Sequence, residues 1–213
     1  MARPRSDIAP RIREAARRCF LADGVDGASL RTIAREARTS IGMVSYYFPT
    51  KDDLFAAVVE EVYGALVADL GRCLDPALPV RERLRRAVVR LGEASAVELD
   101  VMRLVLREAL VSSARLERLL GRFQRGHLAL LAATMADGVA AGELDAELPP
   151  PVLLVATMAM VGLPAILRRV LGDRAPVGRL PRGEELAPLL VDVLYRGIGA
   201  RPPARRRRRA ARD

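Results

Sequence analysis

The amino-acid sequence predicts an all-α protein, with a small three-helix domain at the N-terminus and a larger helical body behind it. Apolar residues recur at three- and four-residue spacing along most of the chain, and no segment shows the alternation and turn spacing of a sheet. A chain of 213 residues is long enough for two domains that each bury a core. Counting the periodic segments between helix-breaking residues gives about nine helices.

The first predicted helix carries a single apolar stripe. Asp7 is the expected N-cap, because this choice leaves Pro10 in the first turn, where its missing N–H is harmless. Gly24 is the expected stop. The stripe indicates a supporting helix that packs against its neighbours, and its members are Ile8, Ile12, Ala15, Ala16, Cys19 and Phe20.

Three further helix starts follow within a short stretch. Ser29 and Ser40 are expected N-caps, since a serine hydroxyl accepts a hydrogen bond from an orphaned backbone N–H. The helix after Ser40 must end before Pro49. Thr50 begins another helix, with Asp53 in the place of a capping-box acid. The helix after Ser29 has one apolar face, made by Leu30, Ile33, Ala34 and Ala37.

Two short helices joined by so tight a turn predict a helix-turn-helix, whose second helix enters the major groove with its N-terminal end. Lys51 is the only lysine beside 34 arginines, and it lies in the first turn of the next helix. A cation opposes the helix dipole at that place, but a helix N-terminus that holds a lysine is a good phosphate clamp. The codon bias of a GC-rich bacterial genome is the favoured explanation of the general excess of arginine.

Three motifs in this stretch resemble the DNA-binding domain of the tetracycline-repressor (TetR) family: IAREA, SIGMVSYYF and PTKDDLF. The resemblance covers residues 7–55, including the first helix and its glycine-bearing loop. Arg38 stands where the family usually has a glycine in the turn, so it must adopt a left-handed conformation or reshape the turn. Ser45 replaces an aromatic that often contacts phosphate, which leaves Tyr46 and Tyr47 for that contact.

The resemblance implies a set of DNA contacts. Ile41 and Met43 would offer apolar contact to base edges, and Gly42 would permit close approach. Either Tyr47 or Phe48 must also help to close the small core. The full expected DNA-binding set is Ser29, Arg31, Thr39, Ser40, Ile41, Gly42, Met43, Ser45, Tyr46, Tyr47 and Lys51, with phosphate contacts from Thr39, Tyr46, Tyr47 and Lys51 and from Ser29 and Arg31 before them.

The formal net charge of +9 is concentrated at the two ends of the chain. Residues 1–55 carry a net +3, residues 56–199 are neutral, and residues 200–213 carry a net +6. A basic N-terminal end on a neutral body suits a DNA-binding head on a domain that handles something uncharged or buried, although basic composition alone is weak evidence. The predicted domains are 1–50 for DNA binding, 51–199 for ligand binding and dimerisation, and 200–213 as a disordered arginine-rich tail.

The body is expected to contain six helices. Breaks at Asp75-Pro76 and Leu78-Pro79 and a proline-rich, acidic loop over Gly142–Pro151 separate them. The predicted ranges are Leu54–Leu70, Val80–Leu99, Asp100–Leu110, Ser113–Gly138, Val152–Val170 and Glu184–Ile198.

The apolar run Val152–Leu167 is too short to cross a bilayer, which needs roughly 20 apolar residues, and Gly162 and Pro164 interrupt it. A helix this apolar must be covered on every side. The resemblance supplies the cover, because family members form homodimers through their last two helices. With no apolar segment typical of a secretion signal near the N-terminus, we expect a cytoplasmic protein without a membrane partner, associated with the nucleoid when bound to its operator.

No catalytic, metal or cofactor site is predicted. His127 is the only histidine, which excludes a histidine-cluster metal site, and no glycine-rich phosphate loop occurs. Cys19 lies on a buried stripe and Cys73 near a loop, as fits two free cysteines in a reducing compartment.

The resemblance further implies that the body holds a cavity for a small effector, whose binding spreads two DNA-binding heads. Arg103 and Arg107, one turn apart, would anchor an acid or serve as surface ion-pair partners. Methionine-rich walls suit varied apolar ligands, although such residues are often simply core. The expected lining is Leu99, Met102, Arg103, Leu106, Arg107, Phe123, His127, Leu130, Leu131, Met135, Met158 and Val161.

The sequence thus predicts a homodimeric repressor that leaves a pseudo-palindromic site on double-stranded DNA when a small, apolar effector binds. Two rival hypotheses stay open. An architectural protein would use the arginine tail and bind DNA regardless of sequence. An all-α enzyme that merely carries a helix-turn-helix would show turnover.

Overall fold

The computed structural model describes residues 7–171, 181 and 183–199. Within these ranges the chain is helical, apart from turns, loops and one isolated antiparallel bridge between Leu144 and Gly199. The helices are α1 (Ile8–Gly27), α2 (Leu30–Glu36), α3 (Ile41–Tyr47), α4 (Lys51–Cys73), α5 (Val80–Gly92), α6 (Ala96–Val111), α7 (Ser113–Arg125), α8 (His127–Ala140), α9 (Pro150–Leu171) and α10 (Gly183–Ile198).

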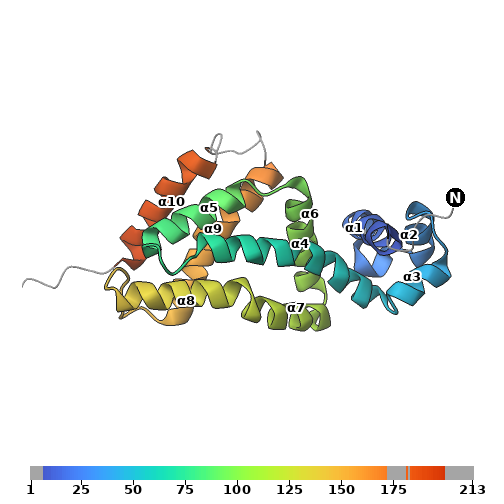
Figure 1. Ribbon diagram of the computed structural model, residues 1–213, viewed down its shortest axis with the longest axis horizontal. Coiled ribbons are helices and arrows are strands. Elements are labelled where there is room, and N and C mark those ends of the chain that lie inside the picture. The colour runs from blue at the N-terminus through green and yellow to red at the C-terminus, as the bar shows by residue number, and fades with distance from the viewer. Residues whose placement is uncertain (1–6, 172–180, 182, 200–213) are drawn as a thin grey trace, which may run out of the picture.

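The molecule is elongated, with α1–α3 gathered at one end as a head and α5–α10 at the other as a body (Figure 1). Helix α4 begins in the head and runs along the middle of the body. The predicted all-α fold with an N-terminal helix-turn-helix is therefore confirmed.

The described part of the chain has ten helices, against the predicted number of about nine. The single helix expected over Ser113–Gly138 is two, α7 and α8, separated at Gly126. The Tyr63 hydroxyl of α4 occupies the break: a Cβ on Gly126 would lie 2.2 Å from it, and the hydroxyl accepts a hydrogen bond from the His127 N–H at 3.2 Å. The Tyr63 side chain, 63 residues earlier in the chain, thus interrupts the helix, although the apolar periodicity of the sequence continues across the break.

The boundary expected between Leu99 and Asp100 is also wrong. Helix α5 ends at Gly92, and α6 begins at Ala96. Ser95 and Glu98 form a full capping box, in which each side chain accepts a hydrogen bond from the other's backbone N–H. This signature is present in the sequence and marks the true start of α6.

Other helix ends differ by a few residues from the predicted ranges. Helix α4 begins at Lys51, directly after the predicted Thr50 cap, and extends to Cys73, beyond the end expected at Leu70. Helix α9 begins at Pro150, inside the expected loop, because prolines are tolerated in the first turn of a helix. The helix continues past Pro164 to Leu171.

Two of the four expected N-cap residues make a side-chain capping hydrogen bond, and two do not. The Ser40 hydroxyl accepts from the Met43 N–H, and Thr50 and Asp53 form a reciprocal capping box, as predicted. Asp7 and Ser29 do occupy the N-cap positions, but neither side chain makes a capping hydrogen bond, so the bond expected of Ser29 is absent.

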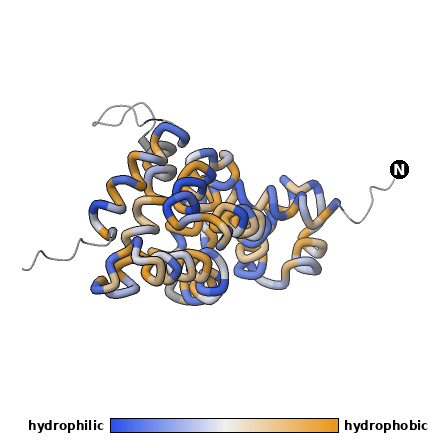
Figure 2. The backbone as a smooth tube through the Cα atoms, turned by 60° about the vertical axis from the view of Figure 1, so that its left-hand side comes forward, coloured by the Kyte–Doolittle hydropathy of each residue, from blue (hydrophilic) through white to orange (hydrophobic). Residues whose placement is uncertain are grey.

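Two hydrophobic clusters form the core. The first joins the head to the front of α4 and includes Val101 and Leu104 of α6 and Leu119 of α7. The predicted α1 stripe lies in it, with Ile12 and Phe20 fully buried. The second cluster fills the body between α4, α5, α6, α8, α9 and α10. Figure 2 shows hydrophobic and hydrophilic positions alternating along the helices within a turn or two, as expected of helices with one buried face.

None of the described helices combines the length and the hydropathy that a membrane span requires. The residues of the predicted arginine-rich tail, 200–213, lie outside the described residues.

Candidate nucleic-acid interface

The turn between α2 and α3 places Arg38 in a left-handed conformation, with a φ of 52°. The left-handed conformation is one of the two outcomes predicted for Arg38, at a position where glycine would adopt a positive φ at lower cost. The guanidinium of Arg11 in α1 donates hydrogen bonds to the carbonyls of Ala37 and Arg38, the latter at 2.8 Å. The first helix therefore supports the backbone of a turn that lacks glycine.

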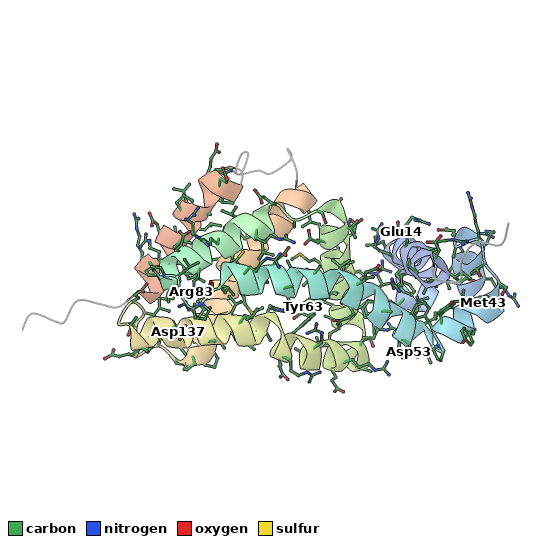
Figure 3. All side chains as sticks on the ribbon, viewed as in Figure 1. Glu14, Met43, Asp53, Tyr63, Arg83 and Asp137 are labelled. Atoms are coloured by element: carbon green, nitrogen blue, oxygen red, sulfur yellow. The ribbon has the colours of Figure 1, made fainter. Side chains whose placement is uncertain are left out.

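Helix α3 is held by its underside and presents its tip to solvent. Val44 is fully buried in the head core, while Gly42 is exposed and the Ile41 side chain is 47% exposed. Met43 is half-buried and lies at the end of the head farthest from the body (Figure 3). An exposed apolar side chain beside a glycine at the start of a short helix provides a surface that approaches a flat or grooved partner closely.

The two tyrosines of α3 face different ways. Tyr46 is 77% exposed, whereas Tyr47 is half-buried and packs against the head core together with Phe48. Their rings meet edge to face at 5.3 Å. The expectation that Tyr47 or Phe48 closes the small core is confirmed for both residues, and Tyr46 is the aromatic side chain that projects outward.

Lys51 lies in the first turn of α4, directly after the Thr50 cap. Its ammonium group donates to the carbonyls of Asp26 at 2.6 Å and Ala28 at 3.3 Å. The lysine thus ties the start of α4 to the connection between α1 and α2. The arrangement places a cation at a helix N-terminus, which is the combination that favours an anion nearby.

The remaining members of the expected DNA-binding set lie around this tip. Ser29, Arg31, Ser40 and Ser45 are exposed and Thr39 is half-buried. The expected residues therefore lie at the N-terminal ends of α2, α3 and α4, along α3, and in the α2–α3 turn. Their contacts with DNA stay a prediction.

The residues expected to line an effector cavity do not gather at one place. Seven belong to the body core or pack against it: Leu99, Met102, Leu130, Leu131, Met135, Met158 and Val161. Arg103, Leu106 and Arg107 are exposed. Arg107 lies against Gly24 and donates to the Leu21 carbonyl at 3.2 Å, so its guanidinium faces the head.

Phe123 and His127 belong to an aromatic group on α4, α7 and α8 that the sequence analysis missed in part. The Tyr63 hydroxyl bonds His127 Nδ1 at 2.8 Å, and the rings of Phe123 and His127 both lie within 6 Å of the Tyr63 ring. The same hydroxyl accepts a hydrogen bond from the His127 backbone N–H at 3.2 Å. Burial lowers the pKa of His127. The spacing of Phe55, Val59 and Tyr63 along α4 was the available signal.

A cavity of about 350 Å³ lies between α4 and α7. Both apolar and charged side chains line the cavity, and none of the expected effector-binding residues is among them. Its lining is Asp52, Phe55, Ala56, Ala57, Val59, Glu60, Arg115, Arg118, Leu119 and Arg122.

Among the residues that the structure describes, no three histidine, cysteine or acidic side chains are grouped as metal ligands would be. Cys19 and Cys73 are free, and burial raises the pKa of each thiol. A raised thiol pKa lowers the thiolate fraction and with it the reactivity.

The head matches a model of a known protein family. Residues 12–58 match the family described as bacterial regulatory proteins, tetR family. That range contains the supporting helix α1, the helix-turn-helix and the start of α4.

Curated relatives agree with this match. The chain is 40% identical over 75 residues to the nicotine-responsive transcriptional repressor of Paenarthrobacter nicotinovorans, an alignment that covers 35% of this chain and 39% of that repressor. It is 28% identical over 192 residues to an HTH-type transcriptional repressor of Streptomyces coelicolor, covering 85% of this chain and 94% of the relative.

Solved structures share the fold over nearly the whole chain. The transcriptional regulator FadR from Bacillus subtilis, solved with stearoyl-CoA, superposes with a TM-score of 0.71 at 18% identity, covering 89% of this chain and 98% of FadR. GusR of Salmonella enterica gives 0.69 at 20% identity, covering 91% and 96%. Residues 12–58 thus match the tetR family of bacterial regulatory proteins, and the solved structures show that the fold is shared over nearly the whole chain.

Proposed function

We propose that the protein is a transcriptional regulator that binds double-stranded DNA as a homodimer and is released by a small effector. The observation that carries the proposal is the tip of α3, where exposed Ile41, Gly42 and Tyr46 stand on a capped helix held from beneath by Val44. An N-terminal helix end of this kind reads base edges in the major groove.

The phosphate contacts follow from the same geometry. Lys51 and the start of α4 flank α3 on one side, and Ser29 and Arg31 of α2 lie before it in the chain. Phosphate contacts fix the orientation of the reading helix and make the affinity dependent on salt. We therefore assign the expected DNA-binding set, from Ser29 to Lys51, to the operator contact.

Homodimerisation through α9 and α10 is supported by an apolar surface on those helices. Val155 of α9 and Val193 of α10 are 65% and 51% exposed. Further exposed apolar side chains on the same two helices are Val152, Leu163, Leu167 and Leu189. Two copies related by a two-fold axis would cover this surface and read two half-sites of a pseudo-palindrome.

The body, residues 51–199, is the proposed effector-binding and dimerisation domain, and residues 1–50 form the DNA-binding domain. Similar proteins are named for such responses: one is a nicotine-responsive repressor, and FadR was solved with stearoyl-CoA. The core residues around Met102, Met135 and Met158 are the proposed apolar site, acting without catalysis in the cytoplasm. The effector shifts the population of head orientations away from the one that fits DNA.

A footprint on the DNA that flanks the protein's own gene tests the proposal. We expect a protected pseudo-palindrome with half-sites about one helical turn apart, relieved by an extract that contains the effector. Uniform coating of the DNA would support the architectural alternative, and the absence of any protection would contradict regulation through flanking DNA.

Replacing Lys51 by alanine gives a sharper prediction. Operator affinity should fall, and the slope of log affinity against log salt should decrease by about one unit per subunit, because each lysine releases counterions from phosphate. The measurement is fluorescence anisotropy over a salt series. The matched control is Arg72→Ala, which removes an exposed cation from the far end of α4. Equal slopes for both variants would exclude Lys51 as a phosphate ligand.

A further inference from the structure

Four charged side chains meet where the head joins the body. Arg115 of α7 donates from Nε to Asp52 at 2.9 Å, from Nη1 to Glu108 at 2.8 Å, and to both carboxylate oxygens of Asp26. Asp26 belongs to the last turn of α1, Asp52 to the first turn of α4, and Glu108 to α6. One guanidinium therefore links four helices. We name these four residues the junction cluster.

The junction cluster is buried on its body side and open on its head side. Arg115 and Glu108 are 8% and 2% exposed, whereas the Asp26 side chain is 72% exposed. The second oxygen of Glu108 accepts a hydrogen bond from the Val25 backbone N–H at 3.3 Å. A buried carboxylate of the body thus binds the head backbone, while the Asp26 link is the one that opens without leaving a buried charge unpaired.

Two members of the junction cluster, Asp26 and Asp52, also border Lys51, the proposed phosphate ligand. Lys51 donates to the backbone carbonyl of Asp26, whose carboxylate binds Arg115. Asp52, the other acidic partner in the head region, is the residue next to Lys51 in the chain. Arg115 therefore binds the carboxylates of two residues that border Lys51: Asp26, whose backbone carbonyl accepts from the ammonium group, and Asp52, the next residue in the chain.

We infer that Arg115 is a positioning residue for operator binding: through Asp26 and Asp52 it sets the orientation of the head and the placement of Lys51. The inference rests on the proposed function. It adds a path by which a change in α6 or α7 reaches the DNA contacts. Only arginine suits this place, because its planar fork directs several N–H groups to separate carboxylates at once, whereas a lysine is a point charge.

The energetic consequence is a change in the fraction of heads that fit DNA. If the Asp26 link opens, the α1–α2 connection samples other positions, and the apparent affinity falls in proportion to the competent fraction. Two heads per operator multiply the effect.

Asp26→Asn is the informative variant, because it weakens the link at its exposed end and leaves Arg115 paired with Glu108 and Asp52. We expect operator affinity to fall at least about fivefold, with an unchanged thermal midpoint, and amide hydrogen exchange of residues 21–30 to become faster. Glu60→Gln is the matched control, since it weakens another carboxylate–arginine pair of α7, the one between Glu60 of α4 and Arg122, without changing a residue of the head. It should leave the operator affinity, the thermal midpoint and the hydrogen exchange of residues 21–30 as in the unmodified protein.

Operator affinity and hydrogen exchange together separate the inference from the proposed function. If the unmodified protein protects no operator, the proposed function fails, and exchange in residues 21–30 still reports whether Asp26 restrains the head. If the unmodified protein binds its operator but Asp26→Asn binds equally well, the positioning role of Arg115 is excluded, whatever the exchange shows. An equal loss of affinity in Glu60→Gln would also exclude it, because the effect would then follow the loss of any ion pair made by α7.

Arg115→Lys extends the test to the centre of the cluster. A lysine keeps the charge beside buried Glu108 but cannot hold three acids, so we expect an affinity loss at least as large as that of Asp26→Asn. We also compare the double variant that carries both Asp26→Asn and Arg115→Lys. If it loses no more operator affinity than Arg115→Lys alone, Asp26 and Arg115 act through one link. Additive losses would contradict a shared path.

Discussion

At the scale of single residues, the head shows that one unfavourable backbone conformation is tolerated when a neighbour supports it. Arg38 has a positive φ, which is costly for a residue with a Cβ. Arg11 binds the carbonyls of Ala37 and Arg38 and so holds the turn from α1. The sequence identified the problem at Arg38, but the supporting residue lies 27 positions earlier and carries no local signal.

Replacing Arg38 by glycine should therefore stabilise the folded head. A glycine adopts the same φ without strain, and we expect a gain of up to about 1 kcal/mol in the free energy of unfolding, measured by chemical denaturation. The matched control is Arg35→Gly in the last turn of α2, where helical glycine should cost about 1 kcal/mol. A loss in both variants would contradict strain at Arg38.

The His127 side chain gives a prediction about pH. Burial lowers its pKa below the ordinary value of 6.5, so the unfolded chain binds the proton more readily than the folded one. Its contribution to stability is complete above pH 6.5 and is lost as the pH falls from there toward the lower folded value. Thermal midpoints of the unmodified protein and of His127→Gln should converge as the pH falls through that window. Parallel curves would show that His127 is not the group that titrates.

At the scale of elements, the break between α7 and α8 is decided by a contact rather than by a local signal. Gly126 has a φ of −107° and a ψ of −120°, outside the main allowed regions, and the Tyr63 hydroxyl lies where a Cβ would be. The residues on either side continue a helical period, so the sequence alone favours one long helix. By contrast, the Ser95–Glu98 capping box was readable from the sequence.

Gly126→Ala should accordingly destabilise the protein by about 2 kcal/mol or more, because the added methyl group displaces Tyr63 from its hydrogen bonds with His127. Gly121→Ala in the middle of α7 is the control. A Cβ there meets only the Arg125 guanidinium, at 3.7 Å or more, so alanine should stabilise the helix by about 0.5–1 kcal/mol. Denaturation midpoints that change alike would exclude the steric account of the break.

At the scale of the whole molecule, the head and the body are not independent units. The first core cluster includes Val101, Leu104 and Leu119 of the body, and the junction cluster lies beside it. Movement of α6 or α7 is therefore transmitted to the head through both packing and charge. The family match itself extends to residue 58, and the core continues along α4 beyond the predicted boundary at residue 50.

The dimer proposal gives a test at the same scale. Val155→Asp and Val193→Asp place charges on the exposed apolar faces of α9 and α10 and should convert a dimer to monomers in sedimentation velocity, with loss of operator affinity. Leu110→Asp is the control, because Leu110 is an exposed apolar residue too, at 89%, but belongs to α6 and not to α9 or α10. A dimer that survives both substitutions would assign the interface elsewhere.

The sequence by itself determined the fold class, the helix-turn-helix and the caps at Ser40 and Thr50, because periodicity and capping act between residues a few positions apart. Tertiary structure alone decided the break at Gly126, the support of Arg38 by Arg11, and the meeting of Asp26, Asp52 and Glu108 at Arg115. Each of these depends on side chains that are distant in the chain and are brought together only when the helices pack.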